Sequence, residues 1–276
     1  MSLVTNCYFE IVDESAPAGN YVSSPETGGP WSAELQHGGP PTALLVRAAE
    51  RLAAAETGRS DLLAVRSAAE FIGPVPVAAL TTQARVVRAA RSAVLIEAAL
   101  RVAGRDCLQA RVWLAAQRDT AAIAPGLPKP VEPSAGLLGP AALFRFPYGE
   151  SIEWRAVHGD IDKPGPAAVW ARPRADLVQG ERLSGLQRAA LIGDSASGIS
   201  SELAWDEWSF LNVDFDVHLS RPLIGDWLYV DASTAIGPSG SGLARSMLAD
   251  ACGPVGATLQ SLVVTPARQP PAITES

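Results

Sequence analysis

The sequence predicts an α+β protein made of two copies of one unit, in each of which an antiparallel sheet wraps a single buried helix. The chain runs twice through short strands, one apolar helix and four further strands. The segment FIGPVPVAAL at 71–80 resembles LSRPLIGDWL at 219–228. Pro74 precedes Pro222 by 148 residues, and the final leucines of the two segments keep that offset. Two copies in one chain imply a pseudo-two-fold axis, as in a fused homodimer.

The first unit is predicted to span residues 1–120. A Pro/Gly turn separates its first two strands, and Pro40 opens its helix. The glycines of His37-Gly38-Gly39 allow the backbone to approach another group closely. The helix, from Pro40 to Ala49, is mostly apolar and is therefore expected to be buried. The predicted strands are 7–12, 21–24, 66–72, 77–87, 93–102 and 107–116.

The second unit is predicted to span residues 151–268, after a Pro/Gly/Ala-rich linker at 121–150 and before a tail at 269–276. Its helix runs from Leu183 to Gly198, where the glycine is the stop signal. The predicted strands are 152–157, 168–172, 208–220, 227–236, 243–249 and 257–265.

Composition limits the possible functions. A net charge of −7 argues against wholesale binding of nucleic acid or of an anionic membrane. The three cysteines are isolated, which argues for a reducing compartment and against a disulfide framework or a CxxC metal site. The N-terminus shows no signal-peptide pattern, and no run of about 20 apolar residues exists. These observations predict a cytoplasmic protein without a membrane span, metal or other cofactor.

Asp194 is the first candidate for chemistry. It shares one face of the predicted helix with Leu183, Leu186 and Ala190, and it lies in the last turn. Burial disfavours an ionised carboxylate, and the C-terminal end of the helix dipole disfavours an anion, so both raise its pKa. A carboxylate with a raised pKa suits general-base work near neutral pH. The structural alternative is a hydrogen bond from Asp194 to a nearby serine hydroxyl.

Two amides on predicted strands are further candidates. In the segment 211–220, the alternation places Asn212 on one face with three ionisable groups, while Leu211, Val213 and the later apolar residues share the other. This pattern also fits a solvated strand face. Gln260 instead lies in a nearly continuous apolar run, which points its amide into a core where it needs partners.

The internal repeat supplies a comparison for these candidates. The offset of 148 places Ala64 opposite Asn212, and Gln260 maps near Ala110 or Arg111. The first helix, from Pro40 to Ala49, contains no acid. Because residues that only stabilise the fold should appear in both copies, the asymmetry predicts a single functional site in the second half.

These residues resemble a known family. A buried helix opened by HGGP and wrapped by a long antiparallel sheet, present twice, resembles the double-hotdog acyl-CoA thioesterase II family. The resemblance implies that an Asp, a Thr and a Gln hold and activate a water molecule. These positions correspond to Asp194 in RAALIGDSAS, to Asn212 ten residues before Pro222, and to Gln260 in GATLQSLVV. Asn212 departs from the family, but its amide can still bond a water or a carboxylate.

The resemblance implies a hydrolase that releases a free acid and CoA from a small-molecule fatty acyl-CoA thioester. CoA would then be part of the substrate, and a carrier-protein thioester remains open. We expect the site where the two halves meet, with His37, Gly38 and Gly39 binding substrate and the glycine N–H groups stabilising the oxyanion. The sequence leaves a monomer or a homo-oligomer of fused hotdog units possible.

Two other functions fit a hotdog fold. Hydratases of this fold pair an Asp with a His five residues later, but Ile199 occupies that position here. A non-catalytic protein that binds acyl ligands is the second alternative, and Asn212 in place of Thr favours it. His158 and His218 are isolated and lack metal-ligand spacing.

Overall fold

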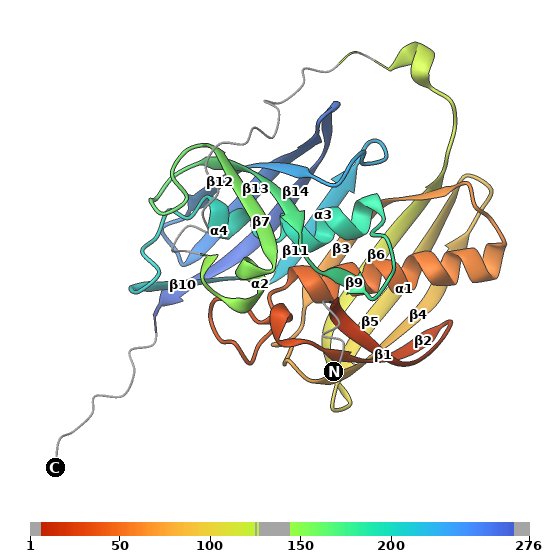
Figure 1. The fold of residues 1–276 in the computed structure, drawn as a ribbon, viewed down its shortest axis with the longest axis horizontal. Helices are drawn as coiled ribbons and strands as arrows, with labels where there is room; N and C mark the ends of the chain where they lie inside the picture. Colours follow the sequence, from red (N-terminus) through yellow and green to blue (C-terminus); the bar gives the residue numbers. More distant parts are fainter. Residues whose placement is uncertain (1–6, 125, 127–143, 268–276) are drawn as a thin grey trace.

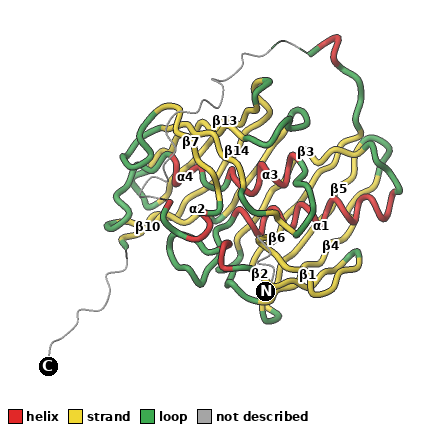
Figure 2. The backbone as a smooth tube through the Cα atoms, viewed as in Figure 1, coloured by secondary structure: helices red, strands yellow, loops and turns green. Residues whose placement is uncertain are grey.

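The computed structural model describes residues 7–124, 126 and 144–267. Residues 125 and 127–143 of the predicted linker and the whole predicted tail at 269–276 lie outside these residues. The predicted α+β double hotdog is confirmed: fourteen strands of the described chain join in one sheet that curves around the helices (Figures 1 and 2). The two longest helices lie side by side against this sheet.

The first half begins with a hairpin and continues with a long helix and four strands. The helix begins at Gly39, next to the predicted Pro40, but it continues past Ala49 to Thr57, where Gly58 ends it in a left-handed conformation with φ 62°. The elements are β1 (Cys7–Ser15), β2 (Ala18–Ser23), η1 (Pro25–Thr27), α1 (Gly39–Thr57), β3 (Leu62–Phe71), β4 (Ala79–Ala89), β5 (Ala93–Val102), β6 (Arg105–Ala116) and η2 (Ala121–Ile123).

The second half repeats this order. Ser184 caps the N-terminus of its longer helix by accepting a hydrogen bond from the Gln187 N–H. The elements are α2 (Pro147–Glu150), β7 (Ile152–His158), β8 (Ala167–Pro173), β9 (Asp176–Val178), α3 (Gly185–Gly193), α4 (Ala196–Ile199), β10 (Trp208–Asn212), β11 (Asp214–Leu219), β12 (Leu228–Ile236), β13 (Ser241–Asp250) and β14 (Gly253–Pro266). The short elements η1, η2, α2 and β9 were not predicted, because they carry too few residues to show a period.

The strand order shows the pseudo-two-fold symmetry. The sheet runs β7-β8-β12-β13-β14-β11-β3-β6-β5-β4-β2-β1-β9, with β10 paired to β14. An offset of 148 residues maps the bounds of β5 onto those of β13. At the centre, where β3 and β11 run antiparallel, Ala68 pairs with Asp216, its own counterpart in the repeat. The axis therefore passes through this pair, and the two halves share one sheet.

A bulge interrupts the predicted strand at 208–220. It ends β10 at Asn212, leaves Val213 between strands and starts β11 at Asp214. Asn212 pairs with Leu262 but Asp216 with Leu259, so β10 and β11 carry one more residue than β14 does. The predicted alternation is therefore wrong on the N-terminal side: Leu211 and Val213 are exposed. The first half has the same irregularity between Ala64 and Arg66.

The predicted helix at 183–198 is also interrupted. It ends at Gly193, and α4 starts at Ala196, so Asp194 is the C-cap of α3 rather than part of a continuous last turn. Gly193 lies close to β14, where a Cβ would be 3.0 Å from Thr258 Cγ2. The main chain leaves the helix at the point where it contacts the sheet.

Helices α1 and α3 cross with their backbones almost in contact. A Cβ on Gly39 would lie 2.1 Å from the carbonyl oxygen of Leu191, so only glycine fits there. Around the crossing, one apolar core includes side chains from both halves, such as Leu44, Ile96 and Val230, all fully buried. The close crossing brings the start of α1 to the end of α3, where the candidate site lies.

Candidate active site

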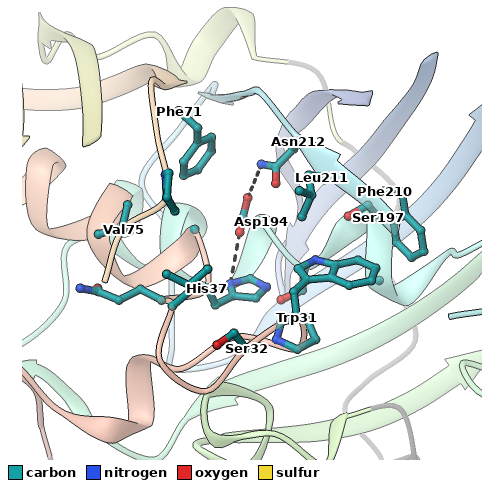
Figure 3. Close-up of a pocket in the computed structure, with 18 of the residues that line it drawn as sticks. Trp31, Ser32, His37, Phe71, Val75, Asp194, Ser197, Phe210, Leu211 and Asn212 are labelled. Atoms are coloured by element: carbon teal, nitrogen blue, oxygen red, sulfur yellow. Dashed lines mark hydrogen bonds and ion pairs between the residues drawn. The ribbon is translucent and has the colours of Figure 1, made fainter. Parts of the chain in front are cut away.

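The Asp194 carboxylate lies at the centre of the candidate site and is 4% exposed. Its Oδ1 accepts hydrogen bonds from Asn212 Nδ2 at 2.8 Å and from Gln260 Nε2 at 2.9 Å. Its Oδ2 lies 3.1 Å from His37 Nδ1. Figure 3 shows this carboxylate between the imidazole and the Asn212 amide. The structure thus brings together the three residues that the sequence singled out, from α3, β10 and β14, and adds His37 to them.

Gln260 holds the end of α3 in place. Its Nε2 also donates to the Asp194 carbonyl oxygen at 3.0 Å, and its Oε1 accepts from the Ser197 N–H at 3.3 Å. The side chain is fully buried, as its apolar run predicted. Both Nε2 and Oε1 of Gln260 are therefore hydrogen-bonded within the protein. Gln260 holds Asp194 in position and is not part of the cavity lining.

Asn212 owes its orientation to the bulge. One extra residue places Asn212 on the side of buried Phe215 and Val217, whereas a regular strand would keep it on the face of Asp214 and Asp216. Its Nδ2 reaches Asp194 and lies 3.2 Å from the Asp214 carbonyl oxygen. The solvated-face alternative therefore does not apply to Asn212, which lines the cavity beside the carboxylate.

Burial dominates the protonation of this site. It raises the pKa of Asp194 from 3.8 to about 7, against the lowering effects of hydrogen bonds from Asn212, Gln260 and the backbones of Gly39 and Gly38. Burial lowers the pKa of His37 from 6.5 to about 3. The serine alternative for Asp194 does not hold, because the Ser195 hydroxyl lies instead 3.2 Å from the Tyr148 hydroxyl. The carboxyl therefore titrates near neutral pH.

The glycines at the start of α1 lie against the acid, and their predicted role toward the substrate stays a prediction. The backbone N–H groups of Gly38 and Gly39 lower the pKa of the Asp194 carboxylate, and the Gly39 N–H donates a hydrogen bond to His37 Nδ1 at 3.2 Å. They lie next to the acid because α1 and α3 cross so closely. A Cβ on Gly38 would lie 2.7 Å from Asp194 Oδ2. Both glycines therefore let α1 approach the acid.

Tyr148 is a site residue that the sequence analysis missed. Its ring stacks on the His37 imidazole at a centroid distance of 3.9 Å and an interplanar angle of 9°. Its hydroxyl donates to the Leu191 carbonyl oxygen at 2.6 Å, which anchors it to α3. Tyr148 belongs to α2, inside the predicted linker. The aromatic run FRFPY at 144–148, within a stretch otherwise rich in Pro, Gly and Ala, was the available signal.

A cavity of about 460 Å³ opens beside Asp194 between the two halves. Trp31 from the first half stacks on Trp205 from the second at 4.9 Å, and both contact Phe210. Figure 3 shows Trp31 and Phe210 on one side of His37 and Phe71 on the other. Its lining includes Trp31, His37, Gly38, Phe71, Val75, Phe144, Phe146, Asp194, Ser197, Trp205, Phe210, Leu211 and Asn212. This apolar wall with a few polar groups is typical of a small-molecule site.

Two further features bear on the class of site. In the described part of the chain, no group of three or more His, Cys, Asp or Glu side chains is placed to hold a metal ion. None of the helices in that part combines the length and hydropathy that a bilayer-spanning segment needs.

Solved structures share this fold at low sequence identity. The tesB protein of Mycobacterium avium subsp. paratuberculosis is 16% identical with a TM-score of 0.66, and the match covers 93% of this chain and 96% of that one. Acyl-CoA thioesterase II TesB2 of Mycobacterium marinum is 15% identical with a TM-score of 0.67, and the match covers 94% of this chain and 97% of that one. A hot dog fold protein of unknown function from Alicyclobacillus acidocaldarius is 16% identical with a TM-score of 0.67, and the match covers 93% of this chain and 96% of that one. No curated protein sequence matches the chain.

Two family models match the sequence itself. The model of the acyl-CoA thioesterase N-terminal domain matches residues 27–115, and the model of the C-terminal domain matches residues 125–264. The second match alone covers half of the chain, and both follow the repeat seen in the fold. The chain therefore belongs to the acyl-CoA thioesterase family and has its double hotdog fold.

Proposed function

We propose that this protein hydrolyses a fatty acyl-CoA thioester to a free acid and CoA, with water as the nucleophile and Asp194 as the base. The observation that carries the proposal is a buried carboxylate with a pKa of about 7 at the wall of an apolar cavity. Such a carboxyl is ionised above neutral pH and still basic enough to accept a proton from water. Family membership supports the acyl-CoA substrate.

The reaction needs three events. The water oxygen forms a bond to the thioester carbonyl carbon, the water loses a proton to the base, and the carbon–sulfur bond breaks as the thiolate leaves. Asn212 Nδ2 donates to Asp194. The Oδ1 of Asn212 then remains as an acceptor for a water molecule at the cavity wall. Gln260 keeps the carboxylate in place through Oδ1 and the Asp194 carbonyl oxygen. The aromatic cavity suits the acyl chain.

The proposal predicts that Asp194→Asn lowers kcat for acyl-CoA hydrolysis by about 10²- to 10⁴-fold, because the proton acceptor is lost. The wild-type rate should rise with pH to a plateau through about pH 7, where burial places the pKa of Asp194. Thiol release from a series of acyl-CoA esters measures both. Asp216→Asn is the matched control, since this partly exposed acid on β11 pairs with Arg66 outside the cavity. An Asp194→Asn variant with full activity would overturn the proposal.

Asn212 in place of the family's Thr favours one alternative, a non-catalytic protein that binds acyl-CoA. The same thiol-release assay separates the two functions when direct binding is measured on the same folded sample. The assay covers about pH 6 to 9, because the pKa of Asp194 is about 7. Saturable binding of an acyl-CoA without thiol release at any of these pH values would support the binding protein. Release of one thiol per acid formed supports the hydrolase.

A further inference from the structure

His37 makes a contact with Asp194 that fixes the positions of the protons. Its Nδ1 lies 3.1 Å from Asp194 Oδ2. In the structure Nδ1 also accepts from the Gly39 N–H at 3.2 Å. When the carboxylate is ionised, Nδ1 carries a proton toward Oδ2, because two lone pairs facing each other at 3.1 Å repel, and the Gly39 N–H then serves the carboxylate alone. A neutral imidazole carries one proton, so Nε2 then has a free lone pair. Burial keeps the imidazole neutral, since it lowers the pKa of His37 to about 3.

The free nitrogen faces the place of reaction. Within the described residues, no group is hydrogen-bonded to Nε2, while His37 lines the cavity. Figure 3 shows the ring extending from the Asp194 contact toward the Trp31 side of the cavity. Tyr148 holds the ring plane by face-to-face stacking, and its own hydroxyl is tied to α3. The imidazole is thus fixed with one nitrogen on the acid and the other toward the substrate space.

The Asp194 carboxylate has little capacity left for a water molecule of its own. A carboxylate offers about four lone-pair sites. Three side chains contact it, the Asn212 and Gln260 amides and His37 Nδ1, and the N–H groups of Gly38 and Gly39 add to the stabilisation of its charge. A water molecule that contacts the acid therefore competes with these donors.

We propose that His37 is a catalytic residue that takes the proton from the attacking water on Nε2 and passes its Nδ1 proton to Asp194. This inference rests on the proposed hydrolase function and identifies the atom that contacts the water. The water O–H bond breaks as its oxygen bonds the carbonyl carbon, a proton joins Nε2, and the Nδ1 proton moves to Asp194 Oδ2. The departing thiolate takes the electron pair of the C–S bond, and solvent restores the protons afterwards. Asp194 is the final acceptor because burial raises its pKa far above that of His37.

The test uses His37→Asn in the full chain. The Asn amide can replace the Nδ1–H donor toward Asp194, but it places no base at the position of Nε2. We expect kcat to fall about 10²- to 10⁴-fold at an unchanged KM. The plot of the remaining rate against pH should no longer show the inflection near pH 7. If Asp194 takes the proton directly, His37→Asn keeps kcat within about threefold of wild type and keeps the inflection, which overturns the inference.

A second variant separates catalysis from packing. His37→Ala leaves a space of imidazole size beside Tyr148, and we expect added imidazole to restore thiol release while pyrrole, of similar shape but without a basic nitrogen, does not. Equal rescue by both, or by neither, contradicts a proton-transfer role. A wild-type protein that releases no thiol overturns the proposed function together with this inference. An active wild type with an equally active His37→Asn variant overturns the inference alone.

Discussion

At the residue scale, Asp194 and His37 behave as one titrating unit. Burial raises the pKa of Asp194 from 3.8 to about 7 and lowers that of His37 from 6.5 to about 3. Between about pH 4 and 6.5 the folded pair holds one titratable proton, on Asp194. The unfolded pair also holds one, on His37. Folding therefore takes up almost no proton from this pair, although both residues are buried.

This proton count predicts how stability depends on pH. The raised pKa of Asp194 alone makes the folded state lose stability as the pH rises from about 4 to 7, by up to about 4 kcal/mol. The lowered pKa of His37 alone makes it gain stability as the pH rises from about 3 to 6.5. We expect the contribution of the pair to cancel in wild type. Without His37 nothing offsets the effect of Asp194. In urea unfolding, the free energy of unfolding of His37→Asn should therefore fall relative to that of wild type as the pH rises from about 4 to 7. Free energies that change in parallel with pH in the two proteins would contradict the prediction.

Asn212 gives a second prediction at this scale. Asn212→Leu keeps a similar volume but removes the amide donor to Asp194, and a hydrogen bond to a charged group is worth about 1.5–3 kcal/mol. We expect kcat to fall about 10- to 100-fold. Asn212→Thr is the matched control, because a hydroxyl can still donate to the carboxylate, and it should stay within about tenfold of wild type. A Leu variant that is as active as the Thr variant would exclude a role for this donor.

At the element scale, the sequence predicted the long strands and both main helices because their periods of 2 and about 3.6 extend over many residues. It did not predict the two interruptions that shape the site. The bulge at Val213 and the end of α3 at Gly193 depend on contacts with β14, which is distant in the chain. The alternation of the strand alone did not predict that Asn212 lies beside Asp194. Only the family resemblance did. The role of Tyr148 depends on stacking between segments that no local pattern connects.

The crossing of α1 and α3 predicts an unusual cost for a small substitution. Gly39→Ala would place a Cβ 2.1 Å from the Leu191 carbonyl oxygen and push the helices apart. We expect the free energy of unfolding to fall by about 1–3 kcal/mol, with loss of activity, because the start of α1 also contacts Asp194. Gly73→Ala is the control: its Cβ meets nothing within 4 Å, and its stability should change by less than about 0.5 kcal/mol. Equal urea midpoints for the two variants would contradict the prediction.

At the scale of the whole molecule, the repeat produces two similar halves but one polar cluster. The offset of 148 places Ala64 opposite Asn212, as predicted, and Val46 opposite Asp194. It places Val112 opposite Gln260, which corrects the predicted match near Ala110 or Arg111, since the paired registers of β5–β6 and β13–β14 superpose at this offset. Val46 and Val112 are fully buried, so the equivalent position in the first half is part of the core.

A structural ion network lies next to that equivalent position. Arg47, 2% exposed, donates to Glu181 from Nε and Nη2, each at 2.6 Å, and to Glu14 from Nη1 at 2.5 Å. Glu50 accepts from Ser184 Oγ at 2.7 Å at the start of α3. These bonds join the two halves at the position that corresponds, through the repeat, to the cavity. Each of these carboxylates is paired with a donor from another segment.

One binding site per chain follows from this asymmetry. We expect a non-hydrolysable thioether analogue of an acyl-CoA to bind in a 1:1 ratio in calorimetry. Because Trp31 and Trp205 line the mainly apolar cavity beside Asp194, tryptophan fluorescence should change with the same saturation point. Trp31→Ala should weaken binding and raise KM with little change in kcat, since Trp31 lies in the apolar wall and the Asp194 carboxylate is held by Asn212, Gln260 and His37. Glu181→Gln, which weakens the Arg47 ion network, should leave the 1:1 ratio and the affinity unchanged. A ratio of two per chain, or binding that Glu181→Gln weakens and Trp31→Ala does not, would place a site in the first half and contradict the single-site prediction.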